Sequence, residues 1–238
     1  MNLKFNKRYW GKKLQYSDWY IRLKKDLDEL FLPVVHDNRA IKTFRHKVYG
    51  LVEEMLDKNQ IPLAEKGFNF DKERKQIDTI VIHHTEEYPN LSPFKISAIG
   101  FIRLYASKYL QNDVVGYKLK GKPVWSGHFY NGKQVFFGYH WCIYPNGKIE
   151  QWLDNSKIGW HSGVWDVNTR SIGIALAGNY EHSTPSTTQI QSVATIIKEK
   201  YSYIDKSRIF GHLEVRRERT CPGDKFINGW KETLINLL

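Results

Sequence analysis

Two short β-branched runs, residues 77–83 and 171–177, restrict most narrowly the folds open to this chain. Each has the length of one strand, and neither shows the polar alternation of a strand with one wet face. A strand that is apolar on both faces lies in the middle of a sheet that helices cover. The two runs therefore predict the central strands of such a sheet.

Helix and hairpin patterns are interleaved with these runs. Asn146-Gly147 is a turn dipeptide, and it predicts a hairpin that pairs residues 139–144 with residues 148–153. Asn131-Gly132 predicts a second hairpin, and residues 207–211 a further short strand. We expect helices at residues 93–110, capped by Ser92, at 188–203 and at 226–237. The fold class predicted is α/β, with a mixed central β-sheet flanked by helices.

Residues 1–75 differ from the rest of the chain in their pattern of apolar and charged residues. Segments 18–32 and 40–57 carry apolar residues at helical spacing among many charges, which predicts amphipathic helices. This stretch holds 17 Lys and Arg against 11 Asp and Glu, which is over half of the total net charge of +11. We therefore expect a basic helical N-terminal extension, residues 1–75, followed by a main domain, residues 76–238.

Residues able to bind a metal occur far apart in the sequence. His83-His84 ends the first run, and His212 and Cys221 belong to a late segment. Two imidazoles and a thiolate suit Zn²⁺, and three protein ligands leave its fourth position open. Side chains alternate along a strand, so only one of the paired histidines faces such a site, and periodicity does not select which. Hydrogen-bonded core histidines and a Cys142–Cys221 disulfide are the competing interpretations.

Four motifs follow one another along the main domain: IVIHHT (80–85), GYHWCIYPNGKIEQ (138–151), GWHSG with N-x-x-SIGIALAGNY (159–180) and GH-x8-CPG (211–223). In this order they resemble the type-2 N-acetylmuramoyl-L-alanine amidases, a superfamily that includes peptidoglycan recognition proteins (PGRPs), wall-recycling amidases and phage lysins. The resemblance covers Ile77 to about Trp230. It implies an amidase/PGRP-like fold and zinc-dependent hydrolysis of the amide between the lactyl group of N-acetylmuramic acid and L-alanine of the stem peptide.

The resemblance also implies roles for single residues. His83, His212 and Cys221 are the implied Zn²⁺ ligands, and Tyr139 lies over the metal in active members. Arg219 stands where many members have Lys or Thr; it is always protonated, so it can stabilise an oxyanion but cannot act as a general base. The nine-residue step from His212 to Cys221 is one longer than the commonest family spacing, so we expect a bulge in that loop.

Three further residues are implied to contact substrate. Trp160 and His161 match the family's W-H-A-G stretch, whose histidine faces the substrate, and Asn168 follows it closely. A packing or positioning role is the alternative for His161, and a core position for Trp160. Asn168 is also expected to fix its loop through side-chain hydrogen bonds to the backbone. Strand alternation places Tyr139 and Trp141 on one face. The extra length before Tyr139 predicts an added hairpin within residues 114–136.

Charge and aromatic content together define the expected partners. A basic chain is drawn to anionic wall polymers, membrane surfaces and nucleic acid alike. Aromatic residues occur in the second and third motifs, so we expect peptidoglycan or muropeptide as the ligand and no nucleic acid. For residues 1–75 we expect anionic wall polymers or a membrane surface, with packing on the main domain as the alternative. A non-catalytic peptidoglycan-binding module is the rival function, which Cys221 and Tyr139 disfavour.

The first residues, MNLKFNKRYWGKKLQ, are charged and lack the apolar segment of a secretory signal. No run approaches the roughly 20 apolar residues that span a bilayer. Such a chain is expected to be made in the cytoplasm. It would then act on the wall after non-classical release, or on cytoplasmic muropeptides.

Overall fold

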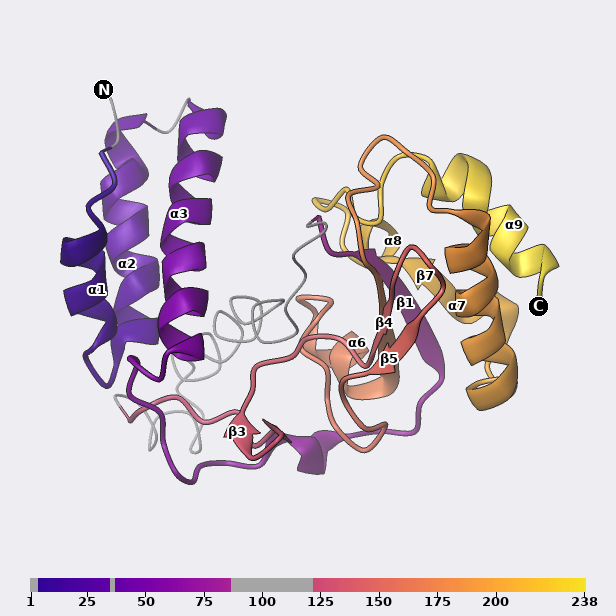
Figure 1. Cartoon of the computed structure of the whole chain (residues 1–238), viewed down its shortest axis with the longest axis horizontal. Helices are drawn as coiled ribbons and strands as arrows, with labels where there is room; N and C mark the ends of the chain where they lie inside the picture. The colour runs from indigo at the N-terminus through magenta and orange to yellow at the C-terminus, as the bar shows by residue number, and fades with distance from the viewer. Residues whose placement is uncertain (1–3, 35–36, 87–121) are drawn as a thin grey trace. The chain divides into compact units, whose positions relative to one another are not determined.

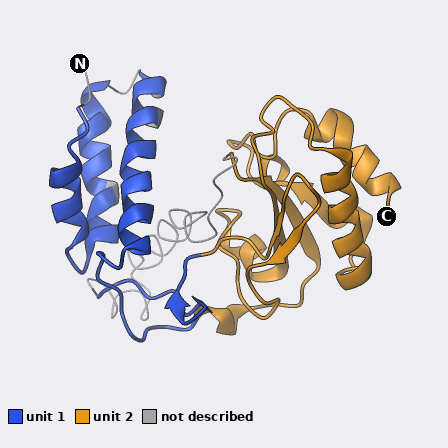
Figure 2. Cartoon of the chain, in the orientation of Figure 1, with its two compact units in different colours: residues 1–69, 98–136 blue, residues 70–97, 137–238 orange. Residues whose placement is uncertain are grey.

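The computed structural model of the chain describes residues 4–34, 37–86 and 122–238. It divides into two compact units (Figure 2), residues 1–69 with 98–136 and residues 70–97 with 137–238. We call the first the helical unit and the second the sheet unit. Residues 122–136 belong with the helices, so the two units are not separated by one cut near residue 75. The helix expected at 93–110 lies outside the described residues.

The described part of the helical unit contains the helices α1 (Lys7–Leu14), α2 (Trp19–Phe31) and α3 (Asn38–Asp57) (Figure 1). The side chain of Asn6 caps α1 by accepting from the Tyr9 N–H, and Asp37 caps α3 in the same way. Each helix buries an apolar face made of Trp10, Leu14, Trp19, Leu23, Leu27, Phe31, Phe44, Val48, Leu51, Val52 and Met55. The two predicted helices are confirmed, and α1 was too short to show a period.

A short hairpin and a β-bridge join residues 122–136 to this unit. Strands β2 (Phe129–Tyr130) and β3 (Lys133–Gln134) pair in antiparallel fashion around Asn131-Gly132. Both turn residues have positive φ, as a tight hairpin turn requires. Leu63 forms a bridge with Val124, and Gln134 Nε2 donates to the Ala64 carbonyl at 3.0 Å. The predicted hairpin at Asn131-Gly132 is therefore present, within the helical unit.

Five strands form the sheet of the sheet unit, in the order β5–β4–β6–β1–β7. The two runs that predicted the centre of the sheet are β1 (Thr79–His84) and β6 (Ser171–Leu176), buried at every position. β1 is parallel to both β6 and β7 (Ile209–Gly211). β4 (Trp141–Ile143) is parallel to β6 and antiparallel to β5 (Ile149–Gln151). The sheet is mixed, as predicted, and the hairpin at Asn146-Gly147 is confirmed.

Helices cover this sheet. α7 (Thr187–Lys200) and α9 (Lys231–Asn236) lie on one face, and a kinked turn, η4 (Phe226–Trp230), leads into α9 (Figure 1). The shorter helices are η1 (Leu32–Val34) in the helical unit and η2 (Phe70–Glu73), α6 (Trp165–Arg170), η3 (Lys206–Arg208) and α8 (His212–Val215) in the sheet unit. In the part of the chain that is described, no helix is long and apolar enough to cross a membrane.

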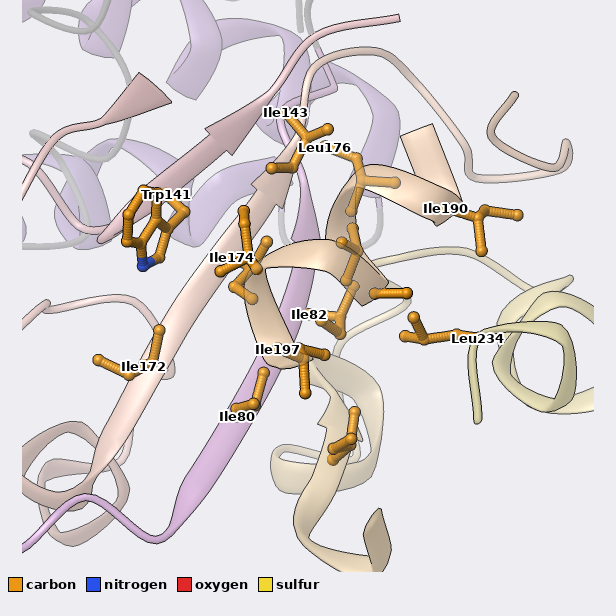
Figure 3. Packing of buried hydrophobic residues seen from close by; sticks show 14 of the residues in the cluster. Ile80, Ile82, Trp141, Ile143, Ile172, Ile174, Leu176, Ile190, Ile197 and Leu234 are labelled. Atoms are coloured by element: carbon orange, nitrogen blue, oxygen red, sulfur yellow. The ribbon is translucent and has the colours of Figure 1, made fainter. Parts of the chain in front are cut away.

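Alternate strand residues point into the layer beneath α7 and α9. Ile80 and Ile82 of β1 pack there with Ile172 and Ile174 of β6 (Figure 3). Because strand side chains alternate, His83 points to the opposite face of the sheet. The apolar core thus occupies one face of the sheet, and the polar residues of the candidate site gather on the other.

Candidate active site

Three side chains with metal-ligand chemistry converge at the end of β1. His83 is the last residue but one of the strand, His212 begins α8, and Cys221 follows in the loop after that helix. One ligand atom from each lies within 4.8 Å of the other two. Cys221 Sγ is 3.7 Å from His83 Nδ1. A tetrahedral zinc with ordinary bond lengths holds such a nitrogen and sulfur about 3.6 Å apart, so the spacing suits that ion.

Hydrogen bonds select which ring nitrogen each histidine offers. His212 Nε2 lies 2.9 Å from the Ser162 carbonyl, which can only accept, so this nitrogen carries the proton. His212 Nδ1 therefore keeps its lone pair. His83 Nε2 is 2.9 Å from His161 Nδ1, while its own Nδ1 faces Cys221. Ligating histidines commonly donate the other ring N–H to a fixed acceptor, and both rings have such a partner.

The Cys221 loop is fixed by backbone bonds at its two sides. The His84 N–H donates to Cys221 Sγ at 3.3 Å, and the Leu213 N–H donates to the Cys221 carbonyl at 2.8 Å. The nine-residue step from His212 is accommodated by α8 and by a turn in which the Arg219 N–H donates to Arg216. Cys142 and Cys221 are both free thiols, so the disulfide interpretation is wrong.

Burial sets the protonation of these groups. Loss of hydration lowers the pKa of His212 to about 4, and lowers the pKa of His83 well below its usual value, an effect that the nearby His212 reinforces. Both rings are therefore neutral at pH 7. Burial raises the pKa of the Cys221 thiol to about 12, so the thiol keeps its proton until a cation displaces it. These are protonation states from which a metal releases a single proton.

His161 stands behind His83. Besides its bond to His83, its Nε2 lies 3.1 Å from Ser171 Oγ, at the start of β6. Its ring lies flat on the strand because residue 173 is glycine: a Cβ there would come 2.8 Å from the ring. If His83 offers Nδ1 to a metal, then His83 Nε2–H donates to His161, and His161 Nε2–H donates to Ser171. The two rings and the hydroxyl thus form one chain with consistent donors and acceptors.

Arg74 holds the backbone at Ser171, the last member of this hydrogen-bonded chain of side chains. It is largely buried, and its Nη1 donates at 3.0 Å to the carbonyls of Asn168 and Ser171. Burial lowers its pKa to about 10, so it stays charged at pH 7, and the charge lowers the pKa of His161 further. No sequence signal distinguishes Arg74 from Lys72 or Lys75 on either side, and Ser162 and Ser171 were likewise not anticipated.

Tyr139 lies beside His83, with ring centroids 4.9 Å apart. Trp141, in contrast, points into the core, where its Nε1 donates to Tyr201. The prediction that these two residues share a face is therefore wrong. The reason is a bend at His140, whose carbonyl accepts from both Trp152 and Leu153 and whose own N–H bonds to Gly173. This interruption reorients the chain before β4 begins.

Arg219 is exposed in the loop that leads to Cys221. Its positive charge lies close enough to lower the pKa of both His212 and Cys221, although burial is the larger influence on each. Its neighbour Arg216 forms an ion pair with Glu218. Arg219 is therefore placed at the edge of the cluster, where a positive charge can act on a bound anion.

Trp160 and Asn168 occupy positions unlike the predicted one. Trp160 is only 2% exposed and packs edge-on against Phe70 and Trp165. Asn168 is fully buried, and its Oδ1 accepts from the backbone N–H and the hydroxyl of Ser162. Substrate contact by these two side chains is corrected to support of the loop that carries His161 and Ser162, the second role considered for Asn168.

A second group with metal-ligand chemistry, His84, Glu86 and Glu181, lies near Cys221. His84 Nδ1 accepts from the Tyr180 N–H at 2.8 Å, so the proton of the neutral ring resides on Nε2. That nitrogen faces Glu86 and Glu181 at 3.8 and 4.0 Å. A protonated nitrogen has no lone pair for a metal. The second group is therefore a donor facing two carboxylates, not a metal centre.

The site and the fold agree with comparison to known families. Residues 73–224 match the Amidase_2 family of N-acetylmuramoyl-L-alanine amidases, and the chain belongs to this family. It is 27% identical over 156 residues to 1,6-anhydro-N-acetylmuramyl-L-alanine amidase AmpD of Haemophilus influenzae, covering 60% of this chain and 83% of that one. It is 23% identical to a peptidoglycan-recognition protein of Drosophila melanogaster, covering 64% and 72%.

An endolysin amidase, LysCS, from Clostridium intestinale is 22% identical and superposes with a TM-score of 0.46, covering 74% of this chain and 95% of that chain. The family resemblance deduced from the four motifs is thus confirmed by the family match.

Proposed function

We propose that this chain is a zinc-dependent amidase that cleaves between the lactyl group of N-acetylmuramic acid and L-alanine of the stem peptide. The observation that carries the proposal is the convergence of His83, His212 and Cys221 beside Tyr139. The three ligand atoms lie close enough together for one zinc ion, both imidazoles are neutral, and the Cys221 thiol would release its proton on binding. Bound there, the metal would supply Lewis-acid activation of a water molecule and of the scissile carbonyl.

The protein's own groups complete the chemistry. His83 and His212 would hold the metal through Nδ1, with their Nε2 protons fixed by His161 and Ser162. The Tyr139 hydroxyl would donate a hydrogen bond to the oxygen on which negative charge develops. Arg219 would stabilise that charge from the rim, and it takes no part as a base because it stays protonated. His161 acts through His83, so we assign it a positioning role and not a substrate contact.

Mass spectrometry of digested peptidoglycan tests the reaction directly. The expected products are stem peptides with a free N-terminal L-alanine and glycan strands that keep the lactyl group. Peptides released by cleavage at any other bond would contradict the assignment.

The Tyr139→Phe variant tests the oxyanion role. Loss of one such donor is expected to lower kcat by about 10²–10³ while zinc content stays at one per chain. Tyr144→Phe is the matched control, because Tyr144 lies just past the other end of β4, where it bonds to Glu150. Unchanged turnover in Tyr139→Phe would show that its hydroxyl does not assist.

A non-catalytic recognition module is the alternative, because peptidoglycan-recognition proteins are among the relatives. Such a module would bind muropeptide tightly in calorimetry and release no peptide, even with zinc at full occupancy. That outcome would replace the enzyme by the module.

A further inference from the structure

A cavity of about 400 Å³ opens between α1 and α2 of the helical unit, and no residue of the amidase site lines it. Three of its lining residues are cations: Lys12 and Lys13 lie at the end of α1, and Arg22 lies on α2. Tyr9 and Tyr16, each about half exposed, form part of the lining. The cavity therefore combines aromatic surface with positive charge.

Trp19 lines the same cavity and brings an unused donor. Its side chain is 1% exposed, and its indole Nε1–H has no acceptor among the residues that the structure describes. A buried donor without an acceptor is costly, and native structures normally provide it with one. That nitrogen has almost no accessible surface, so Trp19 contributes its ring to the wall, and its unbonded N–H reports on changes in the cavity.

The cations are held in place for a ligand. Lys13 bonds to Asp26 at 2.7 Å and lies over the ring of Tyr9, while Arg22 bonds to Asp18 at 2.7 Å and lies over Tyr16. Each pair uses one donor, whereas a lysine has three and an arginine five. With Lys12, the lining offers many more donors than acceptors. The three cations outnumber Asp18 and Asp26, the two carboxylates that pair with them, and this excess of positive charge favours an anion.

We propose that this cavity binds a phosphate group of an anionic wall polymer, one built from polyol or sugar units joined by phosphodiesters. Phosphate oxygens accept from Lys12 and Arg22, and the polyol or sugar units pack on the two tyrosines. This inference rests on the proposed function, because a wall hydrolase meets such polymers at its substrate. It assigns the positive charge of the helical unit to a defined pocket and not to a diffuse surface.

The Trp19 indole N–H is the direct probe. In the full chain labelled with ¹⁵N-tryptophan, eight indole signals are expected, and Trp19→Phe identifies the one from Trp19. Titration with poly(glycerol phosphate) should shift that signal in a saturable way. Lys12→Ala should weaken the binding about fivefold, as loss of one charge-assisted hydrogen bond implies.

Lys25→Ala is the matched control. Lys25 lies on α2 outside the cavity, where it pairs with Glu29, so this variant removes the same charge from the same unit. Equal weakening in Lys12→Ala and Lys25→Ala would overturn the proposal in favour of general charge attraction. An unmoved Trp19 signal, or one that moves only with phosphatidylglycerol vesicles, would overturn it as well. None of these readouts involves hydrolysis, so a failure of the proposed amidase activity would not change their outcome.

Discussion

The two units of the molecule place their polar side chains in opposite ways. The sheet unit buries histidines 83, 84, 140, 161 and 212, each oriented by the backbone or by another side chain. The helical unit keeps its charges near the surface, in ion pairs such as Lys7–Glu54 and Arg22–Asp18. Pairs of that kind, screened by solvent, contribute little to stability.

This difference separates two tasks. Chemistry at a metal needs ligands fixed to a fraction of an ångström, which neighbouring strands and buried hydrogen bonds provide. Attraction to a charged polymer needs only charge and access, which exposed helices provide at long range. We therefore expect changes in the sheet unit to alter metal binding and catalysis, and changes in the helical unit to alter only the capture of substrate.

The largest expected effect is on zinc content. Loss of a residue that hydrogen-bonds to a ligand lowers metal affinity by about 10–100-fold. Cys221→Ala removes a ligand itself, so its zinc affinity should fall further. Cys142→Ala should keep one zinc per chain, because that thiol lies outside the cluster. Lys7→Ala, in the helical unit, should keep it too. Metal analysis after dialysis measures all three, and full zinc retention in Cys221→Ala would refute the site.

His161→Ala tests whether the sheet unit positions its ligands from behind. The variant removes the acceptor of His83 Nε2, so zinc affinity should fall about 10–100-fold, measured by competition with a chelating dye. His161→Asn, which keeps an acceptor, should recover part of the loss. His140→Asn is the control: its ring is equally buried but bonds to backbone at Gly173 and Lys157. A comparable loss of affinity in the control would reduce His161 to a packing residue.

The pH dependence of zinc affinity gives the next effect. In the metal-free chain His212, with a pKa of about 4, is neutral above that pH, whereas Cys221, with a pKa of about 12, keeps its proton. Zinc displaces this one proton, so affinity should rise about tenfold per pH unit from about pH 6 to 8. Cys221→Asp carries no proton in that range and should show almost no slope. A slope near three below pH 6.5 would mean that the histidines titrate normally.

The sequence predicted the framework of the sheet unit because its signals are local. The two apolar runs became β1 and β6, the turn dipeptides became hairpins, and the motifs brought His83, His212 and Cys221 together. Among the residues that orient these ligands, His161 had a positioning role as its alternative, whereas Ser162 and Arg74 were not predicted. Ser162 meets His212 across 50 positions, and Arg74 meets Ser171 across 97. Contacts of that kind depend on strand order and register. A single serine or arginine gives no local sequence signal of either.

Errors occurred where the chain leaves regular geometry or crosses between units. Alternation failed at Tyr139 because the bend at His140 interrupts the strand. The boundary near residue 75 overlooked residues 122–136, which follow β1 in sequence and pack with the helices. Composition groups a segment with stretches of similar residue content. The place of residues 122–136 in the fold depends instead on their contacts with residues such as Leu63 and Ala64.

Gln134 offers the smallest and most discriminating test of the two units. Its Nε2 donates to the Ala64 carbonyl and its Oε1 accepts from the Ser126 N–H, so it ties residues 122–136 together and to the helical unit. Gln134→Ala should lower the free energy of unfolding by about 1 kcal/mol. Hydrogen exchange should then become roughly fivefold faster in the helical unit and stay unchanged in β1 and β6.

Gln189→Ala is the counterpart, because Gln189 donates to Ile143 and Ala177 within the sheet unit. Its faster exchange should appear in β4 and β6 and leave α1–α3 unchanged. If either variant accelerated exchange equally in both units, the chain would unfold as one cooperative body, and the division of tasks between the units would have no basis in stability.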